Sequence, residues 1–164
     1  MKRKSGARAR RPRVARPAGT RSARARATAA EIRSPAAPLP VGPYSQAVAA
    51  DGLLFLSGQI PLDPTTQKLV AGGIEEQTVR VIENLAAVLA AGGSSLAGVV
   101  RTTVYLTDLA LFPRMNAVYA RYFEQVPQPA RATVQAAALP LGAQIEIDAI
   151  ALCARKASAQ RKLR

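Results

Sequence analysis

The stretch VPQPARATVQAAALPLGAQIEIDAIALC, residues 126–153, decides which fold the chain can adopt. It predicts two strands, 132–138 and 144–152, separated by a Leu-Pro-Leu-Gly turn. Alternation along the second strand places Ile145 and Ile147 on one face and Glu146 on the other. A carboxylate on so apolar a strand must face water or have a partner, because burying an unpaired charge is costly.

Arg131 enters the first of these strands and is the candidate partner of Glu146. One interpretation is a structural Arg–Glu pair at the edge of a sheet. The other is a small pocket in which the arginine binds an anion and the glutamate acts as a general acid or base. The stretch alone leaves both interpretations open.

The remainder of the chain predicts three more strands and two helices. Asp51-Gly52 is a hairpin signal, β-branched runs indicate strands, and apolar residues at helical spacing indicate helices. The expected elements are strands over 47–50, 53–57 and 99–106 and helices over 74–91 and 113–125. This order favours an α+β fold, in which both helices cover one face of a mixed sheet. Since the strands are apolar on both faces, we expect the uncovered face to meet another subunit.

The positive charge of the chain is concentrated at its ends. The formal net charge is +13, yet residues 31–154 hold seven Lys or Arg against ten Asp or Glu, a net charge of −3. Residues 1–30 hold eleven Lys or Arg and no acid. We therefore predict a disordered, basic Arg/Ala-rich extension over 1–31, a folded domain over 32–154 and a basic tail over 155–164.

Three interpretations of the basic extension stay open. It is an upstream stretch included by an early start site, an Arg-rich organelle transit peptide, or an arm that binds polyanions without sequence specificity. A secretory signal is excluded because no apolar run follows the charges, and no stretch approaches the ~18 apolar residues of a membrane span. A cytoplasmic location is expected, with organelle targeting by residues 1–30 as the alternative.

The residues that are missing limit the chemistry. The chain has no histidine, which excludes His-based triads, His metal sites and a ribonuclease that works through paired histidines. Its one cysteine, Cys153, allows no intrachain disulfide or thiolate cluster and is interpreted as a plain buried thiol. No metal site and no cofactor are expected.

Several polar residues have both a structural and a functional interpretation. Tyr44 follows Gly-Pro in a constrained turn and either caps the core or lines a pocket. Ser57 and Gly58 end a strand, where small residues serve a turn or let ligand oxygens approach backbone N–H groups. Asn116 lies at the border of the apolar face of the second helix. Its amide is either hydrogen-bonded within the protein or available to contact a ligand.

Six segments, taken in order, resemble the RidA (YjgF) family over residues 32–154. They are Gly-Pro-Tyr-Ser-Gln at 42–46, Ser-Gly-Gln-Ile-Pro at 57–61, Arg-Thr-Thr-Val-Tyr-Leu at 101–106, Asn-Ala-Val-Tyr at 116–119, Pro-Ala-Arg-Ala-Thr-Val at 129–134 and Ile-Glu-Ile-Asp-Ala-Ile-Ala at 145–151. The resemblance implies a chorismate-mutase-like α+β fold, assembled as a homotrimer with clefts between subunits. It also implies hydrolysis of reactive enamine/imine intermediates, such as 2-iminopropanoate and 2-iminobutanoate, to 2-oxo acids and ammonia.

The same resemblance assigns roles to individual residues. Arg131 matches the arginine that holds the substrate carboxylate, and Glu146 matches the acid that activates water and transfers protons. Tyr44, Ser57 and Asn116 match positions that line the pocket, and Thr133 stands where some members have cysteine. The basic ends have no counterpart in the family core.

The sequence therefore predicts a cofactor-independent deaminase of small 2-imino acids. The alternative is an RNA-binding, ribonuclease or translation-inhibitor type of protein that uses the basic N-terminal arm. A third interpretation, a chaperone-like or regulatory protein, is neither supported nor excluded. The preferred imino acid cannot be read from the sequence.

Overall fold

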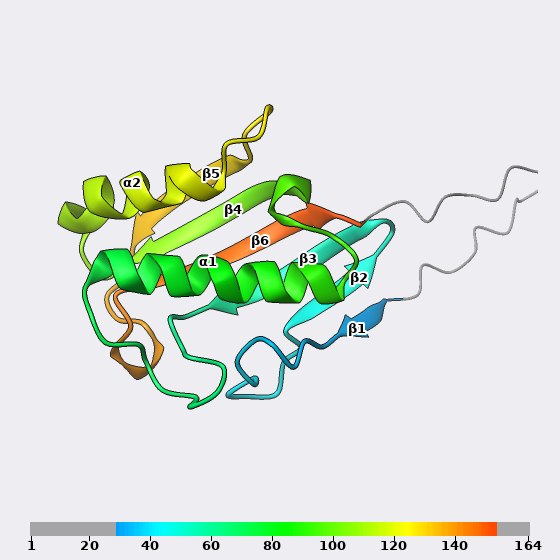
Figure 1. Ribbon diagram of the computed structural model, residues 1–164, viewed down its shortest axis with the longest axis horizontal. Helices are drawn as coiled ribbons and strands as arrows, with labels where there is room; N and C mark the ends of the chain where they lie inside the picture. The colour runs from blue at the N-terminus through cyan, green and yellow to red at the C-terminus, as the bar shows by residue number, and fades with distance from the viewer. Residues whose placement is uncertain (1–28, 154–164) are drawn as a thin grey trace, which may run out of the picture.

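The computed structural model describes residues 29–153 and shows one mixed sheet of six strands with two helices packed on one face (Figure 1). The expected α+β fold is confirmed. The tail over 155–164, and the extension over 1–31 apart from its last three residues, lie outside the described residues.

The strand order in the sheet is β1–β2–β3–β6–β4–β5. Neighbouring strands are antiparallel except β4 and β5, which run parallel. The strands are β1 (Ala30–Ile32), β2 (Ala47–Ala50), β3 (Leu53–Gln59), β4 (Val99–Leu106), β5 (Ala130–Gln135) and β6 (Ile145–Leu152). The helices α1 (Ile74–Ala91) and α2 (Phe112–Tyr122) follow β3 and β4 in the chain. The last strand, β6, thus lies at the centre of the sheet, between β3 and β4.

The predicted bounds are confirmed for β2, α1 and β4 and differ elsewhere for local reasons. The strand expected over 132–138 runs over 130–135, because β5 pairs only with β4 and β4 ends at Leu106. The helix expected over 113–125 spans 112–122. Strand β1 was not expected, since three residues are too short for a periodic signal; its partner is β2.

The core lies between the helices and one face of the sheet. Along β6 the side chains alternate as predicted, with Ile145, Ile147, Ala149 and Ala151 buried beneath the helices. Helix α1 contributes a stripe at helical spacing, including Val81, Leu85 and Val88, that is almost fully buried. The central strand therefore presents Glu146 and Asp148 to the opposite face.

That opposite face also carries exposed apolar side chains and is not covered by residues 29–153. Phe55 on β3 is 44% exposed and Leu152 on β6 is 53% exposed, and Val134 on β5 is also exposed. Phe55 is paired across the strands with Ile150, which lies two residues from Leu152, so these three side chains form one apolar patch. Neither helix is long and apolar enough to cross a membrane.

Two buried amides fasten the loops that flank the sheet. The side chain of Gln46, 3% exposed, accepts a hydrogen bond from Ser34 N (2.7 Å) and donates to the carbonyls of Ser34 (3.2 Å) and Pro38 (2.7 Å). Asn84 of α1 donates to the carbonyls of Ile60 (3.3 Å) and Leu62 (2.9 Å) beyond the end of β3. Both loops contribute walls to the cleft described next.

Candidate active site

Glu146 lies in an open cleft on the uncovered face, at the end of β3. The cleft has a volume of about 310 Å³. Its walls come from the loop before β2, the end of β3, the turn before β6 and β6 itself: Val41, Tyr44, Ser57, Gly58, Ile60, Pro140 and Glu146. The fold thus brings together four of the predicted site residues, Tyr44, Ser57, Gly58 and Glu146.

The carboxylate of Glu146 rests directly on Gly58. A Cβ atom at position 58 would overlap the carboxylate, standing 2.7 Å from Cδ of Glu146. This contact explains why a glycine is needed at the point where the pairing of β3 with β6 is irregular.

Glu146 has no hydrogen-bond or ion-pair partner among residues 29–153. Burial raises the pKa of the Glu146 carboxyl, and the negative charge of Asp148 raises it further. An unpartnered carboxyl with a raised pKa in a cleft is the arrangement expected of a general acid or base.

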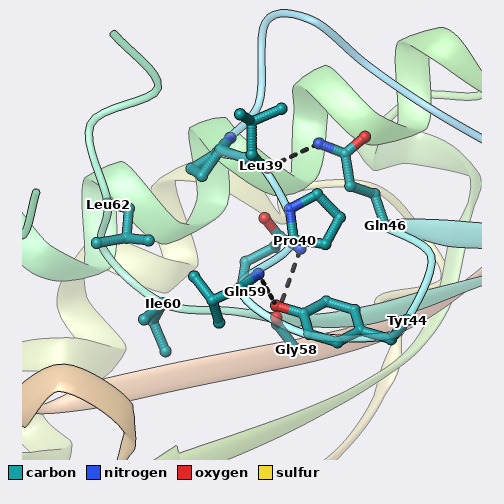
Figure 2. Close-up of a pocket in the computed structure, with 10 residues that line it drawn as sticks. Leu39, Pro40, Tyr44, Gln46, Gly58, Gln59, Ile60 and Leu62 are labelled. Carbon is teal, nitrogen blue, oxygen red and sulfur yellow. Dashed lines mark hydrogen bonds between the residues drawn. The ribbon is translucent and has the colours of Figure 1, made fainter. Parts of the chain in front are cut away.

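Tyr44 and Ser57 are fixed by hydrogen bonds to the backbone. The Tyr44 hydroxyl accepts from Val41 N at 3.2 Å, which closes the proline-rich loop, and the Ser57 hydroxyl donates to Ser45 O at 2.7 Å. Figure 2 shows the Tyr44 ring next to Gly58, in a small pocket that adjoins the Glu146 cleft. Each hydroxyl oxygen retains lone pairs that can accept a hydrogen bond from a ligand.

Arg131 and Asn116 lie in a second cleft, on the helix side of the sheet. This cleft measures about 280 Å³ and lies between α2 and β5; it is lined by Asn116, Tyr119, Ala120, Phe123, Gln128, Pro129 and Arg131. Thr133, two residues along β5 on the same face, is half-buried and lines neither cleft.

Two aromatic rings hold the Arg131 guanidinium. Its Cζ atom is 4.5 Å from the centroid of Tyr119 and 5.6 Å from that of Phe112. The Tyr119 hydroxyl is in turn hydrogen-bonded to Thr102 at 2.8 Å, and burial raises the pKa of Tyr119. No carboxylate of residues 29–153 forms an ion pair with Arg131. The guanidinium is therefore oriented while its N–H groups remain available for an anion.

Within one chain, Arg131 and Glu146 point to opposite faces of the sheet. Arg131 is the β4 register partner of Thr102, which is buried beneath α2, whereas Glu146 is the partner of Tyr105, on the uncovered side. The structural Arg–Glu pair considered from the sequence is therefore wrong for a single chain. Residues an odd number apart along β4 face opposite ways, so one chain alone does not bring the two side chains into one site.

Sequence reasoning missed the residues that support Arg131. Tyr119 packs in the core, and its ring also stacks against the guanidinium. The signal was its position three residues after Asn116, which places both on one helix face. Phe112 offered no such signal, because its approach to Arg131 depends on how α2 packs against β5. Among the described residues, no group of three or more His, Cys, Asp or Glu side chains is arranged to hold a metal ion.

Comparison with known proteins shows the family. A family model described as Endoribonuclease L-PSP matches residues 34–153. The chain belongs to this family, the RidA/YjgF family to which the sequence pattern pointed. Protein DfrA of Myxococcus xanthus is 58% identical over 123 residues, which cover 74% of this chain and 93% of that protein.

Members of the RidA family with more specific names are also similar. The mouse 2-iminobutanoate/2-iminopropanoate deaminase is 46% identical over 121 residues, which cover 74% of this chain and 89% of the mouse protein. The crystal structure of RidA from the Antarctic bacterium Psychrobacter sp. superposes with a TM-score of 0.72 and 42% identity, covering 75% of this chain and 98% of that one. The predicted fold and family are thereby confirmed, while the relatives carry both deaminase and endoribonuclease names.

Proposed function

We propose that this protein hydrolyses 2-imino acids, and the enamines in equilibrium with them, to 2-oxo acids and ammonia without a cofactor. The substrates are small imino acids such as 2-iminopropanoate and 2-iminobutanoate. The active sites lie between the subunits of a homotrimer. The named activity of the mouse relative supports the reaction class.

The observation that carries this proposal is the state of Glu146. Its carboxyl is half-buried, rests on Gly58, has no partner among residues 29–153 and has a raised pKa. Burial and the charge of Asp148 both disfavour the ionised form of Glu146, so it accepts a proton more readily than an ordinary glutamate. A proton acceptor of this kind suits the activation of water near neutral pH.

Arg131 supplies the complementary function, recognition of the substrate carboxylate. Its planar guanidinium can donate two parallel hydrogen bonds to a carboxylate, and the Tyr119 and Phe112 rings set the plane from which it does so. Asn116 lies in the same cleft and offers an amide to the substrate.

A site that uses both Arg131 and Glu146 requires two subunits, because one chain places them on opposite faces of its sheet. The uncovered face around Glu146 carries exposed apolar side chains, including Phe55 and Leu152. Burial of such a surface stabilises an assembly. In the proposed trimer, Arg131 of one subunit approaches the Glu146 cleft of its neighbour.

The chemistry then needs positioning and one proton relay. Glu146 takes a proton from water as the oxygen bonds to the imine carbon, and it passes this proton to the imine nitrogen, which gives a neutral carbinolamine and leaves Glu146 ionised again. Glu146 next transfers a proton from the carbinolamine hydroxyl to the nitrogen, the C–N bond breaks, and the 2-oxo acid and ammonia leave. An imine carbon is already electrophilic, so orientation and proton transfer suffice for the reaction.

A coupled assay tests the proposal. An amino acid oxidase generates 2-iminopropanoate or 2-iminobutanoate, and loss of the imine is followed with the full chain, with Arg131→Ala and with a chain lacking residues 1–28. That deletion leaves β1 intact. We expect the full chain and the deletion to accelerate the loss and Arg131→Ala to do so far less. Equal rates with and without the full chain would refute the proposed activity.

A further inference from the structure

A second acidic residue shares the uncovered face with Glu146. Asp148 lies two residues along β6, so its side chain points the same way and stands about 7 Å along the strand. Tyr105, the β4 register partner of Glu146, reaches diagonally to Asp148, and its hydroxyl donates to Asp148 Oδ2 at 3.0 Å. Figure 1 shows β4 and β6 side by side in the sheet.

The hydrogen bond fixes the position of the Asp148 carboxylate. The same bond is the first cause that raises the pKa of Tyr105, which therefore keeps its proton and continues to donate. Tyr105 of β4 thus holds the Asp148 carboxylate in place on β6, beside Glu146.

Among residues 29–153, the other groups around Glu146 do not neutralise this charge. Strand β3 contributes Ser57 and Gly58, which carry no charge, and the loop before β2 contributes Tyr44. Arg101 is on the same face of β4 but four residues from Tyr105, roughly 13 Å along the strand. In the proposed trimer, Arg131 of the neighbouring subunit has the opposite electrostatic effect on Glu146 to that of Asp148. Arg131 is retained in every variant below.

We propose that Tyr105 and Asp148 are positioning residues for Glu146: together they place a fixed negative charge beside the Glu146 carboxylate and so strengthen it as a proton acceptor. The role of this pair in catalysis rests on the proposed imine hydrolysis. The coupling between the two carboxyls does not, and it can be measured without substrate.

The pair has a defined consequence for pH dependence. Asp148→Asn removes the charge while its amide oxygen still accepts from Tyr105. The Glu146 pKa then falls, and because burial is the larger cause of its elevation, it stays above that of an ordinary glutamate. If Glu146 acts as the base, the acid limb of the kcat profile moves to lower pH and the plateau rate falls a few-fold, since a weaker base accepts protons less well.

The experiment is an NMR titration of the Glu146 carboxyl in the full chain, with 13C-labelled glutamate and the Glu146→Gln spectrum for assignment. It compares wild type, Asp148→Asn, Asp148→Glu and the control Asp51→Asn. Asp51→Asn makes the same chemical change in the β2–β3 turn, where the positive φ of 49° also suits asparagine. Asp148→Thr, which keeps a hydroxyl acceptor and a strand-forming side chain, replaces Asp148→Asn if that variant does not fold.

We expect the Glu146 titration to move to lower pH in Asp148→Asn, to return toward wild type in Asp148→Glu and to be unchanged in Asp51→Asn. An unchanged titration in Asp148→Asn would overturn the proposal, as would an equal shift in the control. Profiles of kcat for the same variants separate the two claims: a shifted titration without any imine hydrolysis would retain the coupling and reject the proposed reaction.

Discussion

Gly58 and Glu146 are in van der Waals contact across β3 and β6, with the glutamate carboxylate lying where a Cβ of residue 58 would stand. The pairing of the two strands is irregular between Leu56 and Gln59, and this irregularity brings Gly58 to the carboxylate. The position of Glu146, the general base of the proposed reaction, therefore depends on residue 58 having no side chain. No polar group of residues 29–153 holds it.

Gly58→Ala is expected to displace the Glu146 carboxylate and reduce kcat by about 10- to 100-fold, since a shift of about 1 Å in a reacting group slows a reaction by about this factor. The fold should survive, because the displaced atoms are the end of a half-buried side chain. Imine hydrolysis and circular dichroism measure the two effects. Gly73→Ala is the control, since its Cβ would meet no atom closer than 3.6 Å. Wild-type activity in Gly58→Ala would show that the carboxylate position is unimportant.

Arg131 variants should separate charge from geometry. Arg131→Ala is expected to raise KM by roughly 10- to 100-fold through loss of charge-assisted hydrogen bonds. Arg131→Lys keeps the charge but loses the planar fork that stacks on Tyr119, so its KM should fall between wild type and Arg131→Ala. Steady-state kinetics test this, with the exposed Arg121→Ala on the same side of the molecule as the control. A lysine variant equal to wild type would argue against two parallel hydrogen bonds.

Glu146→Gln should stabilise the folded protein at neutral pH while removing activity. The folded-state pKa of Glu146 is raised, so its contribution to stability is fully present below the unfolded pKa and is lost as pH rises through the folded pKa. Glutamine has no charge to bury, and its thermal midpoint should exceed that of wild type at pH 7 to 8 and converge with it in acid. Thermal melts across pH measure the difference. A less stable variant at neutral pH would reveal a favourable partner for the carboxylate.

Sequence periodicity predicted the elements of this fold closely. The hairpin signal at Asp51-Gly52 and the runs over 74–91 and 99–106 are local, so their bounds follow from nearby residues alone. Strand β1 was not predicted from the sequence, because it is defined only by its pairing with Ala47–Ala49 of β2. The ends of β5 and α2 likewise depend on their neighbours in space.

The residues of the candidate site could be named from the sequence, but their arrangement could not. The motif resemblance pointed to Glu146 and Arg131, and the end of a strand pointed to Gly58, yet neither could show that Arg131 and Glu146 face opposite ways. That fact depends on the register of β4 with both β5 and β6, which no single segment encodes. The aromatic support of Arg131 by Tyr119 depends on tertiary packing in the same manner.

RNA binding, the alternative suggested by the basic arm and by the family model's name, should depend on residues 1–30 and on salt. Eleven Lys or Arg there would bind phosphates by counterion release, so retention of a generic RNA should fall steeply between about 50 and 200 mM salt. A chain lacking residues 1–28 should lose retention and keep imine hydrolysis. Salt-resistant RNA binding or RNA cleavage by the shortened chain would favour the ribonuclease alternative.

The most direct test of the account is subunit complementation between Arg131→Ala and Glu146→Gln. At substrate concentrations well below the wild-type KM, each variant alone is expected to be nearly inactive. If every site takes Arg131 from one subunit and Glu146 from its neighbour, random mixing at equal amounts rebuilds intact sites at about a quarter of the interfaces.

Imine hydrolysis is therefore measured after the two variants are unfolded and refolded together, with separately refolded samples, combined afterwards, as the control. We predict recovery of about a quarter of wild-type activity in the co-refolded mixture only. A mixture no more active than its separate components, although mixed assemblies are shown to form, would contradict the two-subunit site.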